Sequence, residues 1–256
     1  MKILKFKKQS KDKYKLYLDN NSDITLYEDV IIKNNLLITK EISDELLEAL
    51  KKQNNDMYAY TLALGYISVK MRSIKEINDY LIKKGFNNLV ANKVSERLIK
   101  EGYLNDLKYA KSLINDSMNL TNKGPQKIKM ELIKYGVNKD IIESEIALID
   151  QRKVEEKLNK LIDKELKIKK GSQNAIKIKI INHFVNLGYS KDLVTSILTG
   201  KEITSDKSKL KKDYAKLYNK YKVKYNGQEL LYFISQKLYS KGYTASDIKE
   251  VLKEEN

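Results

Sequence analysis

The stretch Ile77–Asn87, with the sequence INDYLIKKGFN, contains a pattern that returns three more times along the 256-residue chain. Its anchor is a glycine followed by an apolar residue, and the intervals between successive anchors are 51, 52 and 54 residues. The four anchors are Gly85-Phe86, Gly136-Val137, Gly188-Tyr189 and Gly242-Tyr243. A recurrence of this length is typical of helical repeats. The spacing therefore predicts a chain built from four similar units.

Other residues keep fixed distances from each glycine. An isoleucine eight residues before it and a large apolar residue four before it share one helix face. We expect the glycine to end this helix with a positive φ, and the residue two positions later to cap the next helix. The recurring residues are Ile77, Ile128, Ile180 and Ile234; Leu81, Leu132, Phe184 and Leu238; and Asn87, Asn138, Ser190 and Thr244.

Start signals define the remaining helix boundaries. Ser73 and Glu76 form a capping-box pattern, and the single proline, Pro125, fits the first position of a helix. Gly171-Ser172 and Asn226-Gly227 mark equivalent breaks. A further helix precedes each pair, near residues 57–70, 107–120, 152–169 and 206–224. The predicted fold is therefore mainly α, with an elongated array of three-helix repeats over residues 57–106, 107–151, 152–205 and 206–256.

Residues 1–56 have a different character. Tyr14–Leu18 and Ile24–Tyr27 are rich in strand-forming residues, and a turn cluster separates them, which predicts a β-hairpin. A third strand is expected near Ile3–Lys8, because an isolated hairpin is only marginally stable. Helices are expected over Glu28–Asn34 and Ser43–Gln53. These elements form a small N-terminal β-hairpin/α region.

The composition excludes several kinds of chemistry. The chain has no cysteine and one histidine, His183, so thiolate metal sites, cysteine nucleophiles and multi-histidine sites are ruled out. Phosphate-binding, dinucleotide-binding and hydrolase motifs are also missing from the sequence. No apolar run reaches the ~18 residues of a membrane span, and no signal-peptide core is present. We therefore expect a cytoplasmic protein that uses neither a metal nor a cofactor, and an enzyme would need an acidic site that the motifs do not reveal.

The charge points to a polyanionic partner. Fifty basic residues oppose 34 acidic ones, for a net charge of +16. Lysine outnumbers arginine 47 to 3, a bias that an AT-rich coding sequence also produces. However, the excess is uneven: residues 153–205 and 206–256 each carry +5. The distribution therefore favours a binding surface in the last two repeats.

Two lysine rows lie at helical spacing in these repeats. Like charges four residues apart repel, and a polyanion along the row would relieve that cost. A plain solvated face accounts for the spacing equally well. The tyrosines of the second row's helix are interpreted as core in preference to a base-stacking platform. The rows are Lys153, Lys157, Lys160, Lys164 and Lys167, then Lys209, Lys212, Lys216, Lys220 and Lys224; the tyrosines are Tyr214, Tyr218, Tyr221 and Tyr225.

Four short motifs follow one another along the chain: Tyr66–Ser73, Lys84-Gly85-Phe86, Gly102–Asp106 with Tyr109-Ala110, and Lys123-Gly124-Pro125. Taken together, they resemble the RecX family of bacterial regulators of the RecA recombinase. They cover about residues 57–150, and residues 1–56 are similar to the extension of Gram-positive members. Two departures stand out: Lys70 replaces the arginine of the family's Leu-Ser-x-Arg motif, and this chain has four predicted repeats where compact members have three.

The resemblance implies a non-enzymatic role, in which the protein binds the RecA filament on single-stranded DNA and inhibits strand exchange, ATP hydrolysis and coprotease activity. Such a role belongs to DNA repair and the SOS response. Direct binding of single- or double-stranded DNA is also implied. The alternative is a helical-repeat DNA- or RNA-binding protein without a recombinase partner. We expect the protein to be a monomer, with a hinge at Ile203–Ser208. The predicted contact residues are Lys70, Arg72, Lys83, Lys84, Lys123, Lys127, Lys157, Lys164, Lys212, Lys216 and Lys220.

Overall fold

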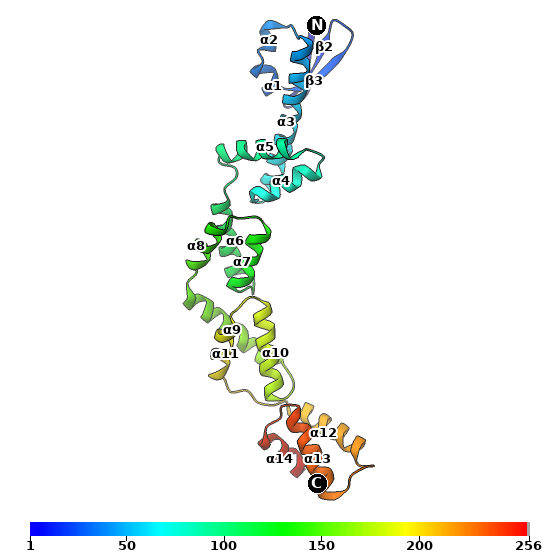
Figure 1. Ribbon diagram of the computed structural model, residues 1–256, viewed down its shortest axis with the longest axis vertical. Coiled ribbons are helices and arrows are strands. Elements are labelled where there is room, and N and C mark those ends of the chain that lie inside the picture. The colour runs from blue at the N-terminus through cyan, green and yellow to red at the C-terminus, as the bar shows by residue number, and fades with distance from the viewer. Residues whose placement is uncertain (255–256) are drawn as a thin grey trace. The chain divides into compact units, whose positions relative to one another are not determined.

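A computed structural model describes residues 1–254, which are mainly helical (Figure 1). The last two residues of the predicted fourth repeat, 255 and 256, lie outside the described part. The strands are β1 (Ile3–Ser10), β2 (Lys13–Leu18) and β3 (Asp23–Tyr27). The helices are α1 (Glu28–Lys33), α2 (Leu36–Thr39), α3 (Asp44–Val69), α4 (Ile74–Lys83), α5 (Asn88–Lys100), α6 (Asp106–Leu120), α7 (Pro125–Lys134), α8 (Lys139–Ala147), α9 (Gln151–Ile168), α10 (Gln173–Asn186), α11 (Lys191–Thr199), α12 (Lys207–Tyr221), α13 (Gly227–Ser240) and α14 (Ala245–Glu254).

The N-terminal strands form one antiparallel sheet in the order β1-β2-β3, which confirms the predicted hairpin and the additional first strand. Leu16, Leu18 and Leu26 are buried on its inner face, in a cluster that includes residues of α1, α2 and α3. The short helix α2 was not predicted. The three helices therefore cover the apolar face of the sheet, which a small sheet needs in order to be stable in water.

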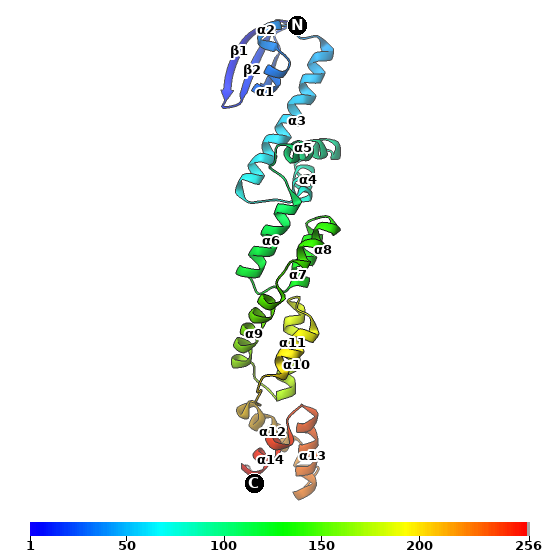
Figure 2. The same ribbon diagram turned by 90° about the vertical axis from the view of Figure 1, so that its left-hand side faces the viewer.

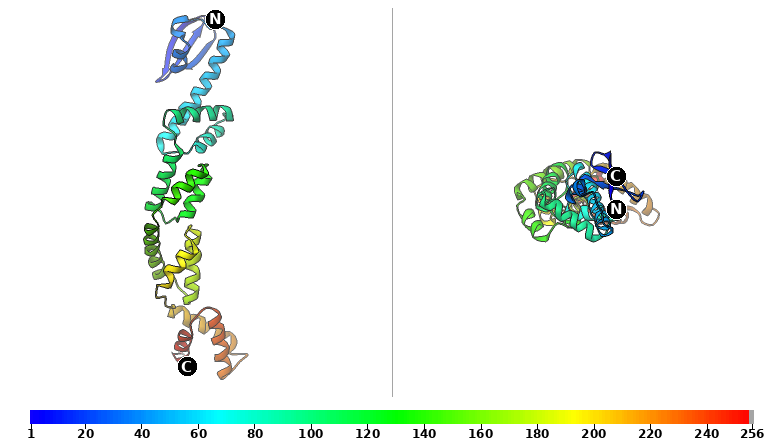
Figure 3. Two further views of the ribbon diagram at one scale, coloured as in Figure 1. Left: turned by 60° about the vertical axis from the view of Figure 1, so that its left-hand side comes forward. Right: turned by 90° about the horizontal axis from the view of Figure 1, so that it is seen from above.

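Helix α3 corrects the helix breaks that were predicted between residues 43 and 70. The two helices expected over 43–53 and 57–70 are one uninterrupted helix of 26 residues (Figure 3). The polar run near Asn54 resembled a break, but the Asn54 side chain binds the edge of β3 instead. Its Oδ1 accepts from the Tyr27 amide at 2.9 Å, and its Nδ2 donates to the Thr25 carbonyl at 3.0 Å.

The predicted helix ends are confirmed at the four anchor glycines, whose φ values are 95°, 74°, 92° and 86° in chain order. Ser73 and Glu76 form the complete capping box, and Pro125 is the first residue of α7. Each of these caps is formed by a few neighbouring residues, so the helix ends that they define could be predicted from the sequence.

Separate apolar cores lie in three of the predicted repeats. One contains residues of α3, α4 and α5, a second those of α9, α10 and α11, and a third those of α12, α13 and α14. Figure 2 shows α9 beside α10 and α11. By compactness, residues Met1–Ala110 and Lys134–Ile141 form one unit, and the remaining described residues form a second. Among the described residues, no helix combines the length and apolar character that crossing a membrane requires.

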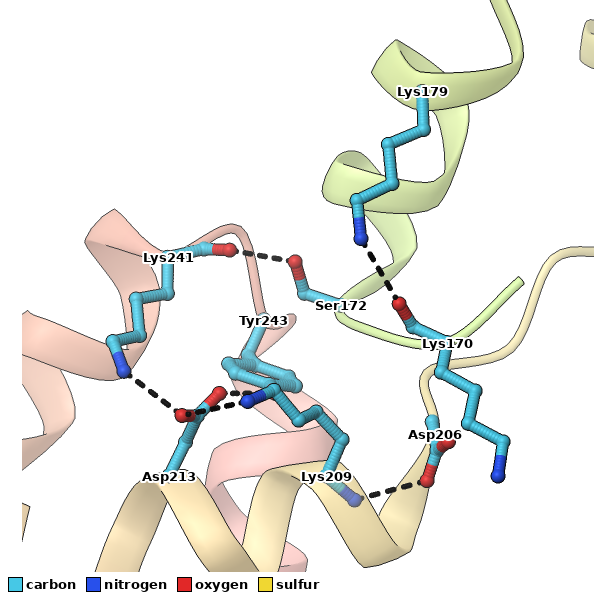
Figure 4. A network of polar contacts seen from close by, with 8 residues as sticks. All are labelled: Lys170, Ser172, Lys179, Asp206, Lys209, Asp213, Lys241 and Tyr243. Atoms are coloured by element: carbon cyan, nitrogen blue, oxygen red, sulfur yellow. Dashed lines mark hydrogen bonds and ion pairs between the residues drawn. The ribbon is translucent and has the colours of Figure 1, made fainter. Parts of the chain in front are cut away.

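Neighbouring repeats share one recurrent contact. The start of the second helix in one repeat binds the glycine turn that ends the second helix of the next. The Ser73 hydroxyl donates to the Tyr135 carbonyl at 2.7 Å, and the Ser172 hydroxyl donates to Lys241 at 2.6 Å (Figure 4). At the middle joint Gly124 has no hydroxyl, and its amide donates to Leu187 at 2.7 Å. Each joint brings the positive end of one helix dipole to the negative end of another.

The segment expected to act as a hinge, Ile203–Ser208, is held by hydrogen bonds to α10 and α14. Gln173 of α10 donates its side-chain amide to the Ile203 carbonyl at 2.8 Å and its backbone amide to Ser205 Oγ at 3.1 Å. The Ser205 hydroxyl in turn donates to Asp247 of α14 at 2.7 Å. The sequence suggested a flexible linker because these partners lie 30 or more residues away.

Asp213 is the buried polar centre of the last repeat. Its carboxylate accepts from the Tyr243 hydroxyl at 2.9 Å and from the Lys241 ammonium at 3.0 Å, and Lys209 lies 3.5 Å away (Figure 4). Burial disfavours the charged carboxylate, but the hydrogen bonds and cations outweigh it and hold the pKa of Asp213 below its ordinary value. Asp213 therefore stabilises the repeat in its ionised form.

The pH dependence of stability tests this role. Because the pKa is lower in the folded state, the contribution of Asp213 is present above the ordinary value of 3.8 and is lost as the pH falls through the folded value. We expect Asp213→Asn to lower the unfolding free energy by about 2 kcal/mol at pH 7, with a deficit that shrinks towards pH 2. Urea titrations between pH 7 and pH 2 measure it, and a constant deficit would contradict the assignment.

Candidate interaction surfaces

Helix α12 separates its lysines into two groups. Three of them are paired with acidic residues: Lys207 with Glu250, Lys209 with Asp213 and Lys211 with Glu254. The other group, which we call the α12 row, is exposed and has no acidic partner within residues 1–254. It consists of Lys212, Lys216 and Lys220. The free charges of this helix thus lie along one row at four-residue spacing.

The tyrosines of α12 and the following turn are mostly core, as predicted. Tyr214 is buried, and the rings of Tyr221 and Tyr225 lie 4.7 and 4.8 Å from the ring of Phe233. Tyr218 differs, since 39% of its surface is exposed. It lies two residues from Lys216 and from Lys220, which turns it about 200° away from the α12 row. Tyr218 therefore adds no ring to this row, whereas the Lys220 ammonium lies 5.2 Å from the ring centroid of Tyr221.

A basic cleft lies between α9 and the end of α6. It has a volume of about 590 Å³, and its lining includes four lysines against one acidic side chain, Glu156. The lysines of this α9 cleft are Lys153, Lys157, Lys160 and Lys164. Three of them are exposed at the surface. A cleft with this charge suits a phosphate or carboxylate chain, because low-dielectric walls strengthen its field.

Lys157 is the exception in this cleft. Its ammonium donates to the Met118 carbonyl at 2.7 Å, and it also contacts the carbonyls of Ser117 and Lys123 at 3.3 and 3.4 Å. The Ser117 and Met118 carbonyls belong to the last turn of α6, where a cation is favoured by the helix dipole, and the Lys123 carbonyl lies in the loop that follows. Burial lowers the pKa of Lys157. The Lys157 ammonium therefore binds backbone carbonyls of its own chain, a contact that the spacing of lysines in the sequence could not reveal.

Removing this amine should weaken the fold. We expect Lys157→Met to cost about 2 kcal/mol of unfolding free energy, because three carbonyls lose a charged donor. Lys160→Met, a neighbour on the exposed side of α9, is the matched control and should change stability by less than about 0.5 kcal/mol. Urea denaturation compares the two. Equal stability of both variants would show that the Lys157 contacts contribute nothing.

Arg72 also has internal partners. Its guanidinium lies 3.7 Å from the ring centroid of Tyr66 and 3.2 Å from the Glu76 carboxylate. Only 11% of the side chain is exposed. Glu76 is itself the capping-box residue of α4, so Arg72 ties the end of α3 to the start of α4. Arg72 was predicted to contact a partner, but in the structure its side chain is held by Tyr66 and Glu76.

The other predicted residues have varied surroundings. Lys70, Lys83, Lys84, Lys127 and Lys164 are exposed, whereas Lys123 forms an ion pair with Glu131 at 2.7 Å. The structure gathers Lys83 and Lys84 in one cleft with Tyr66 and Tyr80, whose rings stack at 4.1 Å. It places Lys157 and Lys164 in the α9 cleft. The α12 row forms a third group.

The fold and these surfaces define a class of protein: a tandem array of three-helix repeats with basic faces. Two family models match the chain, for the first three-helix domain of RecX over residues 59–98 and for the second over residues 105–144.

Similar proteins extend this match to almost the full length. The chain is 36% identical to the regulatory protein RecX of Streptococcus uberis over 99% of both chains. It is 27% identical to that of Staphylococcus haemolyticus over 98% of this chain and 96% of the relative. A crystal structure of a regulatory protein RecX, at 22% identity, shares the fold with a TM-score of 0.69 over 77% of this chain and 98% of its own. RecX from Lactobacillus salivarius, at 28% identity, gives a TM-score of 0.53 over 57% of this chain and 96% of its own. The chain belongs to the RecX family.

Proposed function

We propose that this protein regulates the RecA recombinase by binding the RecA filament on single-stranded DNA, where it inhibits ATP hydrolysis, strand exchange and coprotease activity. The observation that carries the proposal is the relationship to regulatory RecX proteins over nearly the whole chain. The role acts in DNA repair and the SOS response, in the cytoplasm. It needs no catalytic centre, because a protein that occupies a surface can block the events on it.

The free lysines supply the chemistry for such a surface. The α12 row and the exposed lysines of the α9 cleft are uncompensated cations that could meet DNA phosphates or acidic side chains of RecA. We therefore assign partner contacts to Lys160, Lys164, Lys212, Lys216 and Lys220 first, and retain Lys70, Lys83, Lys84, Lys123 and Lys127 as further candidates. We propose that Arg72 and Lys157 stabilise the fold through their contacts inside the chain and do not touch the partner. We propose that the protein binds as a monomer.

Cosedimentation tests the partner directly. RecA filaments assembled on long single-stranded DNA with a nonhydrolysable ATP analogue are pelleted with increasing protein. We expect the protein to pellet at a saturating ratio to RecA, and to remain in the supernatant with RecA alone. If it pellets equally well with DNA that lacks RecA, the alternative of a nucleic-acid-binding repeat protein without a recombinase partner is favoured instead.

A further inference from the structure

The N-terminal region conceals a strong separation of charge. Residues 1–18 contain seven lysines and one acidic residue, whereas residues 19–56 contain four lysines and nine acidic residues. The first group forms β1 and β2, and the second forms β3 and the helical side of the unit. The two nearly cancel in the total, so the net charge of this region gave no sign of a basic surface.

The strand register places four of these seven lysines on one face. Lys5 pairs with Tyr17, and Lys7 pairs with Lys15, between β1 and β2. Lys15 in turn pairs with Thr25 of β3. Alternate residues of a strand share a face, so these side chains lie opposite the buried face of Leu16 and Leu26. Lys13 continues the same face of β2.

This outer sheet face has more positive charge than its own acids neutralise. Lys15 forms an ion pair with Asp23 at 2.9 Å, and the Lys13 ammonium lies 4.6 Å from the ring centroid of Tyr27. Lys5 and Lys7 are exposed and have no acidic partner among residues 1–254. Moreover, Lys7 lies directly across from Lys15, and like charges at such positions destabilise a sheet. An anionic ligand would remove this repulsion.

We propose that the outer sheet face binds the phosphate backbone of nucleic acid. Lysines two residues apart on a strand are ~6.7 Å apart, close to the rise of two phosphates along one strand of a duplex. Tyr17 lies among them and offers a ring for base stacking. Protein interfaces are depleted in lysine, which favours nucleic acid over an acidic protein as the partner. The inference is separate from the proposed regulation of RecA, because it requires only DNA.

Binding of labelled oligonucleotides in the absence of RecA tests this surface. The double variant Lys5→Glu, Lys7→Glu is compared with Lys33→Glu, Lys52→Glu, which makes the same change of charge on the helical side of the unit. Fluorescence anisotropy is recorded with a 30-nucleotide oligothymidine and with a 30-base-pair duplex. We expect the first variant to bind at least one of them about 10-fold more weakly at 50 mM salt, with a salt slope reduced by about 1.4 for two lost contacts to single strands. The control should stay within about twofold of the unaltered protein.

A second variant and the inhibition of RecA separate a binding role of the sheet face from an effect on folding or on a protein contact. The milder variant Lys5→Gln, Lys7→Gln, with an unchanged unfolding midpoint, should give a smaller loss of affinity, which separates binding from folding. The proposal is overturned if the unaltered protein binds neither oligonucleotide, if the sheet variants bind both as tightly as it does, or if the control loses as much affinity. Unchanged oligonucleotide binding with lost inhibition of RecA would identify a protein contact instead. Weakened DNA binding with retained inhibition supports the sheet site, whatever the fate of the RecA proposal.

Discussion

Replacing Gly188 with alanine is expected to be among the most destabilising single substitutions in the chain. Its φ is 92°, and an added Cβ would clash with the Lys127 backbone nitrogen and lie 2.6 Å from the Lys127 Cβ. Neither atom can move away by rotation of a flexible side chain. The helix end must therefore separate from the start of α7, and we expect a loss of about 3 to 5 kcal/mol in unfolding free energy.

Gly85 is the matched control for this substitution. It ends α4 with a φ of 95°, but an added Cβ there would meet nothing within 4 Å. Gly85→Ala should therefore cost only the backbone strain, about 1 to 2 kcal/mol. The difference in unfolding free energy between the two variants therefore measures the contact between repeats, because the strain of a positive φ is common to both.

Two measurements distinguish these glycines. Urea midpoints should fall further for Gly188→Ala than for Gly85→Ala. Amide hydrogen exchange of Gly124 and Gln126, which donate to the carbonyls of Leu187 and Gly188, should accelerate in Gly188→Ala only. Similar losses in the two variants, with protected amides at Gly124 and Gln126, would mean that the joint between α7 and α10 is not a stabilising contact.

The second large effect is expected on binding. Reversal of the whole α12 row, Lys212→Glu, Lys216→Glu and Lys220→Glu, removes three uncompensated cations and adds three anions along one helix face. Loss of three phosphate contacts, together with the new repulsion, should weaken binding to DNA or to the RecA filament on the order of 100-fold at 50 mM salt. The unfolding free energy should change little, because none of the three side chains is buried.

A control within the same repeat makes this test specific. Lys237, Lys249 and Lys253 are also exposed, but they lie on α13 and α14. Their reversal to glutamate changes the net charge by the same amount, so any general effect of charge should appear in both variants. Equal affinity of the two triple variants would return the α12 row to the role of a solvated face.

The repeat architecture was predictable because its signals are local. The glycine turns, the capping box at Ser73 and the proline that begins α7 each need only a few neighbouring residues. The single helix α3 was not predictable in this way. Asn54 looks like part of a polar break, and only the edge of β3, almost thirty residues away, gives its side chain partners.

The same limit applies to the candidate surfaces. A row of lysines at helical spacing looks uniform in the sequence, yet Lys209 pairs with Asp213 and Lys157 caps the end of α6, 39 residues away. The pair of Lys209 with Asp213 is local, four residues apart on α12, whereas only the tertiary contact of Lys157 distinguishes it from the free lysines of α9. On the N-terminal strands, by contrast, the alternation of Lys5, Lys7, Lys13 and Lys15 was visible, and averaging the charge over residues 1–56 hid it.

The most direct test of the central claim is the rate of ATP hydrolysis by a bacterial RecA on single-stranded DNA, measured with increasing amounts of this protein. If the protein occupies the RecA filament, the rate should fall steadily and reach a low plateau at or below a one-to-one ratio to RecA. The triple variant of the α12 row should require more protein for the same inhibition. An unchanged rate at a stoichiometric amount of folded, unaltered protein would contradict the assignment of this chain as a RecA regulator.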